Sequence, residues 1–319
     1  MKIKNRIAAI WRAIVSGRKI NDDISCVGEI PRVERLVQPE IACQSDTRMI
    51  PKLFIFLTLC LTPCAAWQPD AAAIVRRAVD QYAKNDETLR NYTYKAFHIE
   101  RELDGKGAVK TTHTTLDEIM YIGGRRFTNP LEKDGKPLPE AERKRNAEKL
   151  DRAVQEAAKL TPEERKAREA ETRRRSTRET MGHVPEAYTL TIVAEPQLNG
   201  RPTWQVRAVP RRDYKGPYAA VFRNLEGTLW IDKEDSAWVR FEADTTDTIS
   251  FGFFLAQIGR GTRISVERSR VNQEVWAPKT LSLKASARLA LVKSVHAEAE
   301  INYSDYRRFK TDSRLLDPE

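Results

Sequence analysis

Apolar residues between Ile74 and Tyr82 recur at the spacing of one helix face. Pro69-Asp70 stands just before them and suits a helix start. The polar run 84–87 follows and interrupts the apolar spacing. We therefore predict an amphipathic helix that begins near residue 70 and ends at this polar run.

From Tyr92 onward, apolar and polar residues alternate with the period of two that is typical of strands. Asn199-Gly200 supplies the two positive-φ positions of a tight hairpin. No strand–helix–strand crossover pattern intervenes after residue 188, so we predict an antiparallel meander. The predicted strands are 92–103, 109–121, 190–194, 204–208, 227–232, 238–242, 264–266, 281–283, 289–292 and 297–301.

Residues 130–183 differ in kind, because Glu, Lys, Arg and Ala dominate them. They predict a charged insertion of two helices, and Thr161-Pro162-Glu163-Glu164 is a start signal for the second helix. The first helix carries an apolar stripe of Ala147, Leu150, Val154 and Ala157. The second helix is polar on almost every side, as a solvated helix is.

These elements predict an α+β fold that is mostly β: a curved antiparallel half-barrel sheet with an N-terminal covering helix and a charged helical insertion. A curled sheet needs its apolar face filled by side chains, a helix or a ligand. The apolar segment 249–258 is a second cover beside the helix. We expect it to lie between two strands, where it plugs the core or contacts a ligand.

The stretch from Lys52 to Ala66 has the order of a secretory signal, with a positive charge, an apolar run and small residues. The apolar run is too short to span a membrane, which takes about 20 residues. Lipid attachment at Cys60 or Cys64 is not expected, because the preceding residues are not small. We predict a signal peptide at 49–66, cleaved near Ala66, a periplasmic location, and a single domain over 67–319.

Residues 1–48 precede this segment. The simplest interpretation is a mis-called start, since Met49 stands immediately ahead of the signal pattern. The alternative is a real extension, in which Ile7, Trp11 and neighbouring basic residues form an amphipathic helix at a membrane surface.

The positions of the cysteines and the net charge of the chain narrow the range of possible functions. All four cysteines lie within residues 1–66, so a chain cleaved after Ala66 has neither disulfides nor a thiolate nucleophile. Residues 1–66 hold ten Lys or Arg against six Asp or Glu, so they contribute +4 of the net +10 and leave +6. That excess suits an anionic surface or an acidic partner. We expect no nucleic-acid partner, because no aromatic-interleaved basic motif is present.

No catalytic residue, metal ligand set or cofactor is predicted. The sequence lacks the nucleophile elbow, the paired-histidine zinc helix and the phosphate loop. The four histidines fall in separate segments, and Asp232, Glu234 and Asp235 share a turn that needs polar residues in any case. A hydrolase is therefore only a remote alternative.

Several motifs together resemble a known family. They are Trp204-Gln205-Val206-Arg207-Ala208-Val209-Pro210, Gly227-Thr228-Leu229-Trp230-Ile231-Asp232, 251–255, Glu274-Val275-Trp276-Ala277-Pro278 and 303–309. With the order of elements, they resemble the LolA-like superfamily of outer-membrane lipoprotein-sorting proteins, in its uncharacterised exported branch, over about residues 69–310. The resemblance implies a half-barrel that holds acyl chains under covering helices. Its relatives include carriers and a periplasmic regulator, so function does not follow from the fold.

Two binding hypotheses remain. In the first, the chain is a lipid or lipoprotein binding, carrier-like protein whose partner is a lipid or an acylated protein. The candidate lining of its cavity is Trp204, Phe241, Phe251, Phe253, Phe254 and Trp276. In the second, the sheet is a filled scaffold and the charged helices dock an envelope protein, as in a non-enzymatic regulator. We expect a monomer in both.

Overall fold

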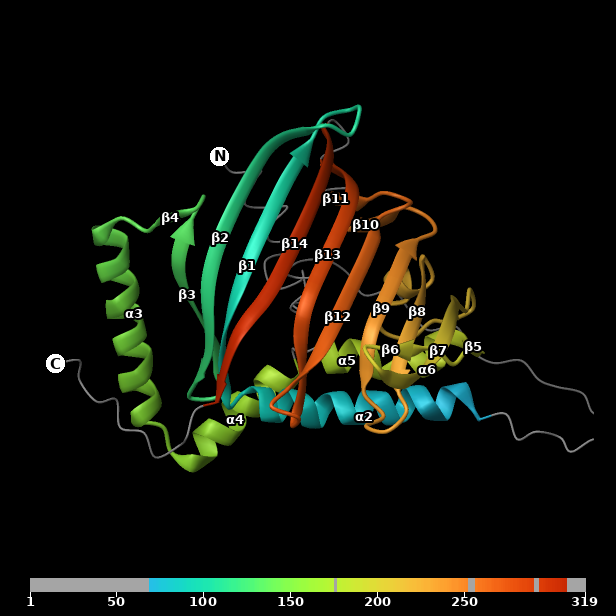
Figure 1. Cartoon of the computed structure of the whole chain (residues 1–319), viewed down its shortest axis with the longest axis horizontal. Coiled ribbons are helices and arrows are strands. Elements are labelled where there is room, and N and C mark those ends of the chain that lie inside the picture. The colour runs from blue at the N-terminus through green and yellow to red at the C-terminus, as the bar shows by residue number, and fades with distance from the viewer. Residues whose placement is uncertain (1–68, 175–176, 252–255, 290–292, 309–319) are drawn as a thin grey trace, which may run out of the picture. The chain divides into compact units, whose positions relative to one another are not determined.

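The computed structural model describes residues 69–174, 177–251, 256–289 and 293–308. They form one open sheet of long strands with several helices (Figure 1). The predicted signal peptide at 49–66 and residues 1–48 lie outside the described residues.

The elements of the described chain are mostly strands, as predicted. The helices are α2 (Ala71–Leu89), α3 (Glu140–Ala158), α4 (Pro162–Arg174), α5 (Thr177–Gly182), α6 (Val184–Ala187) and α7 (Ala219–Phe222). The strands are β1 (Tyr92–Leu103), β2 (Val109–Ile122), β3 (Arg125–Lys133), β4 (Lys136–Pro137), β5 (Tyr188–Ala194), β6 (Gln197–Leu198), β7 (Arg201–Pro210), β8 (Leu225–Asp232), β9 (Trp238–Thr245), β10 (Ile249–Phe251), β11 (Ala256–Ile258), β12 (Arg263–Val271), β13 (Val275–Leu289) and β14 (Lys293–Arg308).

The main sheet has the order β4-β3-β2-β1-β14-β13-β12-β9-β8-β7-β5. Every strand pair of the described residues is antiparallel, and within this part of the chain the two edges do not meet. From β5 to β14 the chain is the predicted meander, and β1 then pairs with β14 so that β1–β4 widen the sheet. The predicted α+β fold, an open antiparallel half-barrel sheet with covering helices, is confirmed.

Helix α2 begins as predicted but ends later. The side chain of Asp70 accepts a hydrogen bond from Ala72 N at 2.9 Å, which caps the helix. The predicted end at 84–87 is wrong, because the helix continues to Leu89. Asn85 is buried there, and its Oδ1 accepts a hydrogen bond from Trp276 N at 3.0 Å. A tertiary hydrogen bond thus makes a polar residue part of the buried helix face.

The charged insertion contains both predicted helices, α3 and α4, and the short helix α5, and the short helix α6 follows directly after residue 183. Helical structure begins at Glu140 rather than at 130, because β3 and β4 occupy residues up to Pro137. The predicted start signal of α4 forms a reciprocal cap. Thr161 N donates to Glu164 Oε2 at 2.9 Å, and Glu164 N donates to Thr161 Oγ1 at 3.2 Å.

The insertion connects the two edges of the sheet. The chain leaves the β4 edge, passes through α3 to α6 and enters β5 at the opposite edge. In Figure 1, α3 lies beside β3, and α5 lies near α2. Ten strand spacings separate the edges, about 48 Å along the sheet. The insertion is therefore a strap that carries the chain from one edge to the other.

The apolar segment 249–258 does not lie between two strands as expected. Its described residues form a hairpin of β10 and β11, in which Ile249 pairs with Ile258. Strand β11 pairs in turn with the end of β13, where Ala256 lies opposite Leu289. Part of the segment thus extends the sheet, because its backbone groups pair with those of a neighbouring strand.

The strand register defines two faces. Directly paired residues point to the same face, and one row of them crosses six strands: Val206, Leu229, Phe241, Val266, Leu281 and Ile301. Ile74, Val75 and Ala78 of α2 belong to the same buried cluster as Val206 and Leu229. We call the face that carries this row the helix-side face. Helix α2 packs on part of it.

Candidate functional site

The helix-side face remains apolar beyond the first row. A second row, two residues farther along each strand, consists of Leu190, Ala208, Gly227, Ala243, Ile264, Leu283 and Ala299. Ile264, Leu283 and Ala299 are only half-buried. Among the described residues, Ile264 packs in neither of the two large hydrophobic clusters. The face therefore presents apolar side chains that α2 does not bury.

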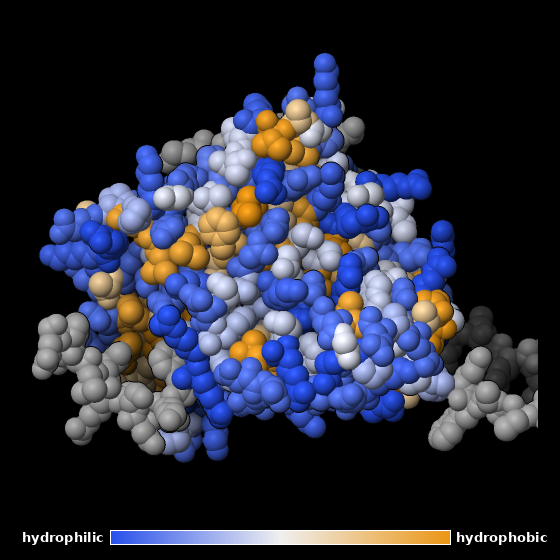
Figure 2. Space-filling model, in the orientation of Figure 1, coloured by the Kyte–Doolittle hydropathy of each residue, from blue (hydrophilic) through white to orange (hydrophobic). Residues whose placement is uncertain are grey.

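The other face of the same strands is polar. Ion pairs follow one another across it, among them Arg207–Glu226, Arg240–Glu242 and Lys284–Glu298. Figure 2 shows one side of the molecule, on which hydrophilic side chains predominate and hydrophobic patches are separate. The contrast between the two faces of strands β5 to β14 makes the helix-side face the candidate binding surface.

Polarity changes where β1 joins the sheet. The first row, whose last apolar residue is Ile301, continues with His98, Thr115 and Lys133. His98 Nε2 lies 3.4 Å from Asp117 Oδ2. Along this row, the helix-side face is thus apolar from β7 to β14 and polar from β1 to β3, whereas Tyr94, Ala96 and Ile119 keep another part of β1 and β2 apolar and buried.

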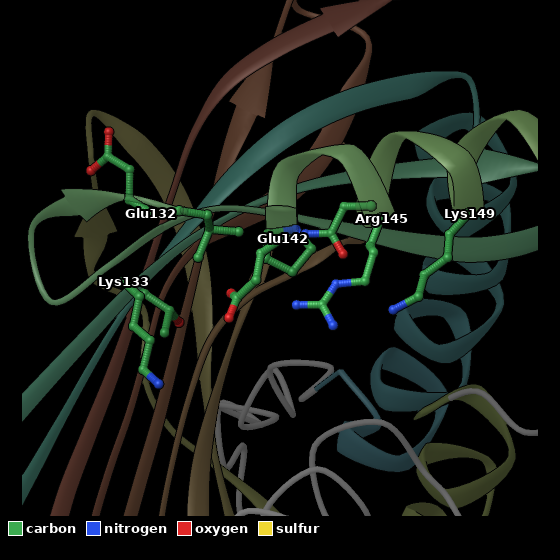
Figure 3. A pocket seen from close by; sticks show the side chains of 9 residues that line it. Glu132, Lys133, Glu142, Arg145 and Lys149 are labelled. Carbon is green, nitrogen blue, oxygen red and sulfur yellow. The ribbon is translucent and has the colours of Figure 1, made fainter. Parts of the chain in front are cut away.

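A pocket of about 350 Å³ lies at this polar end, between α3 and strands β2 and β3. Thr115 and Lys133 of the cross-sheet row line it, and α3 contributes Glu142, Arg145 and Lys149 from one side of the helix. In Figure 3, the side chains of Lys133, Glu142 and Arg145 point into a common space, whereas that of Glu132 points away from it.

The glycines at the β2–β3 turn let the strap approach the sheet. Gly123 and Gly124 have φ of 55° and 80°, which favours glycine. A Cβ on Gly123 would lie 2.8 Å from Ala157 Cβ, and one on Gly124 would lie 2.8 Å from Glu169 Cγ. The turn therefore packs closely against the C-terminal end of α3 and the middle of α4.

Arg268 is a buried cation under α2, with 3% of its surface exposed. Its guanidinium lies 5.0 Å from the ring centroid of Tyr82 and 4.8 Å from that of Trp238. Nη2 donates to the carbonyl of Trp276, whereas Nη1 has no hydrogen-bond partner among the described residues. Burial lowers the pKa of Arg268, and the phenol of Tyr82 opposes this. The cation–π contacts hold α2 against β9 and β12.

The structure brings two of the predicted lining residues to one face. Trp204 and Phe241 pack beside the cluster under α2, on the helix-side face. Trp276 belongs to a separate cluster with Ala237 and Val239, and its Nε1 donates to Asp235 at 2.8 Å. Phe251 pairs with Ala256 in the β10–β11 hairpin. Phe253 and Phe254 lie outside the described residues.

The acidic turn after β8 is a structural element. Asp232 is fully buried and accepts hydrogen bonds from Arg201 Nε at 2.6 Å and Nη2 at 2.9 Å. It also accepts the backbone N–H groups of Glu234 and Asp235. Burial alone would raise the pKa of Asp232, but Arg201 and these N–H groups hold it below its ordinary value. Three of these hydrogen bonds end on Oδ1 and one on Oδ2, so the carboxylate is held by the fold itself.

In the part of the chain that the structure describes, His, Cys, Asp and Glu side chains form no group of three that could hold a metal ion. Nor does any helix of the described residues have the length and apolar character needed to cross a membrane.

The basic residues of the pocket are functional candidates that the sequence did not reveal. The sequence predicts an apolar stripe on the first helix of the insertion and a solvated second helix, and it does not single out Lys133. Glu142, Arg145, Asn146 and Lys149 follow the i, i+3, i+4, i+7 spacing of one helix face. That spacing was the available signal, but the pairing of this helix face with β3 depends on tertiary structure.

An open antiparallel sheet with one apolar face and a helix packed on it defines the class of this protein. No family model and no curated protein matches the chain. Three solved structures that it resembles are a putative outer membrane lipoprotein-sorting protein domain from Vibrio parahaemolyticus, a LolA superfamily protein from Nitrosomonas europaea, and MucB of Pseudomonas aeruginosa in its complex with MucA.

Sequence identity to these three is 10%, 9% and 11%, and the TM-scores are 0.32, 0.28 and 0.22. The matches cover 76%, 76% and 73% of this chain and 95%, 95% and 99% of the others. The neighbours thus include the LolA superfamily that the sequence resembles. At these values we draw no argument from the likeness.

Proposed function

We propose that this chain is an exported, carrier-like protein of the cell envelope that binds the acyl chain of a lipid or lipidated partner on its helix-side face. The observation that carries this proposal is the apolar surface that continues past α2, with Ile264, Leu283 and Ala299 half-buried. The signal-like stretch 52–66 supports export to the periplasm. We assign no catalytic residue and no cofactor.

The half-buried apolar part of the face is a patch on three neighbouring strands. Ile264, Leu283 and Ala299 lie side by side on β12, β13 and β14, two strand spacings or about 10 Å across. The adjacent row is already filled, since Val206, Leu229, Leu281 and Ile301 are buried. Each methylene of an acyl chain that the patch removes from water contributes about 0.8 kcal/mol, so the chain binds there without directional chemistry.

The test compares two neighbouring residues of β12. Ile264 points to the helix-side face and Ser265 to the polar face, and both are half-buried. We expect Ile264→Asp to weaken binding of an environment-sensitive fluorescent fatty acid at least tenfold, about 1.4 kcal/mol. Ser265→Asp introduces the same charge one position away and should leave the affinity unchanged.

Far-UV circular dichroism and the melting temperature of both variants control for unfolding. Absence of saturable binding by the unmodified protein would contradict the proposal, as would an equal loss of affinity in the two variants. In either case the sheet is a filled scaffold.

The second candidate is a scaffold or regulator that docks an envelope protein through the strap. Helix α3 has no buried residue, and Val154 of its apolar stripe is 37% exposed. An exposed apolar stripe on a helix is a feature by which helices dock into the groove of a partner protein. Loss of a pulled-down envelope protein on Val154→Asp, with fatty-acid binding retained, would favour this function.

A further inference from the structure

One row of the helix-side face connects the apolar surface to the pocket. It runs from Ile301 on β14 through His98 and Thr115 to Lys133 on β3. Three strand spacings separate its ends, about 14 Å. A ligand that extends from the apolar surface to the pocket meets the half-buried side chains of Ile264, Leu283 and Ala299 on β12 to β14 and polar side chains at the pocket.

The pocket gathers three cations. Lys133, Arg145 and Lys149 line it and, among the described residues, none of them forms an ion pair. Arg145 Nε donates to Ala141 O at 3.2 Å, which orients the guanidinium and leaves both terminal nitrogens available. Glu132 and Glu142 also line the pocket, so the formal charge of the lining is +1.

Figure 3 adds the direction of these groups. Lys133, Arg145 and Lys149 come from two elements, β3 and α3, and Glu132 points away from the space that Lys133 and Arg145 share. Thr115 and Asn146 line the same pocket and supply a hydroxyl and an amide. The pocket of about 350 Å³ is thus lined by several hydrogen-bond donors, some charged and some neutral.

We infer that this pocket binds an anionic, phosphate-bearing headgroup whose acyl chain lies on the helix-side face. This rests on the proposed function and adds the headgroup to it. A phosphate group presents several acceptor oxygens, Arg engages them with two parallel N–H groups, and Lys acts as a point charge. The pocket volume of about 350 Å³ leaves room for a headgroup larger than a carboxylate.

The experiment uses three competitors against a bound fluorescent fatty acid. They are oleoyl lysophosphatidic acid, mono-oleoyl glycerol with the same chain and a neutral head, and glycerol 3-phosphate with the charge and no chain. We expect lysophosphatidic acid to bind about tenfold more tightly than the neutral lipid, and less so at high salt. Glycerol 3-phosphate alone should not compete.

Single substitutions in α3 assign the effect to the pocket. Arg145→Gln and Lys149→Gln should each reduce the preference for the charged lipid about threefold to fivefold. Glu142→Gln removes a carboxylate from the lining and should increase the preference. Lys144→Gln is the matched control, because Lys144 is exposed on the same helix but does not line the pocket.

The outcomes separate the two claims. If neither lipid binds, the proposed function fails. If both lipids bind equally, or if Arg145→Gln and Lys149→Gln leave the preference unchanged, the headgroup site is refuted while acyl binding stands. Competition by glycerol 3-phosphate alone would also refute it, because the pocket would then be a site for a free phosphate ester.

Discussion

Substitution of Asp232 by Ala tests whether the acidic turn after β8 is structural. Asp232 has no exposed surface, and four hydrogen bonds converge on its carboxylate, two from Arg201 and two from the backbone N–H groups of Glu234 and Asp235. Removing one partner of a buried ion pair costs about 3–5 kcal/mol, because the other charge is left uncompensated.

The lower end of that range applies here. The side chain of Arg201 is 22% exposed, and its Nη2 also lies 3.0 Å from Glu234 Oε2 and 3.3 Å from Asp235 Oδ2. It therefore keeps water and two carboxylates in Asp232→Ala. We expect a loss of about 3 kcal/mol, and a melting temperature lower by about 6–12 °C for a domain of this size.

The assay is thermal unfolding at several pH values. The pKa of Asp232 is lowered in the folded state, so its contribution is complete above the unfolded pKa of about 3.9 and disappears as pH falls through the folded pKa. The difference between wild type and variant should therefore be constant near neutral pH and decrease in acid.

The matched control is Asp244→Ala, which removes an equally bidentate but exposed pair with Arg263. It should have a much smaller effect, because exposed pairs contribute little. A loss at Asp232 no greater than at Asp244, or a difference that grows on acidification, would refute the assignment of Asp232 to the fold.

Two further predictions concern the strap and its attachment. Replacing residues 140–174 by four Gly-Ser residues, which reach about 14 Å, should prevent folding. A 30-residue linker, with a reach of about 100 Å, should lower the melting temperature only slightly. Equal stability of the two variants would contradict the role of the strap. Gly123→Ala should cost about 1–3 kcal/mol in chemical denaturation, because its Cβ would lie 2.8 Å from Ala157 Cβ at a φ of 55°. Gly105→Ala meets nothing within 4 Å and should be neutral.

Features that depend on adjacent residues followed from the sequence. Asn199-Gly200 adopts φ of 53° and 77°, as the predicted hairpin needs. The cap of α4 forms between residues three apart. Alternation gave most strands of the meander and the antiparallel sheet, because one face of each strand is apolar. These features are set by contacts between residues that are close in the sequence, so they form in this fold as predicted.

Features that depend on distant residues did not follow. The helix continues past Asn85 because Trp276, 191 residues away, donates to its side chain. Lys133 and Arg145 line one pocket only because α3 returns against β3. The sequence likewise could not show that Trp276 packs apart from Phe241. Each of these features depends on the strand register of the sheet, which no short stretch of sequence specifies.

Native mass spectrometry of the full chain, purified without added lipid, tests the central claim most directly. We expect a population that carries a mass increment of one acyl lipid, reduced in Ile264→Asp and retained in Ser265→Asp, since these residues lie on opposite faces of β12. A protein without any increment, which also takes up none when fatty acid is added, would contradict an acyl-binding face.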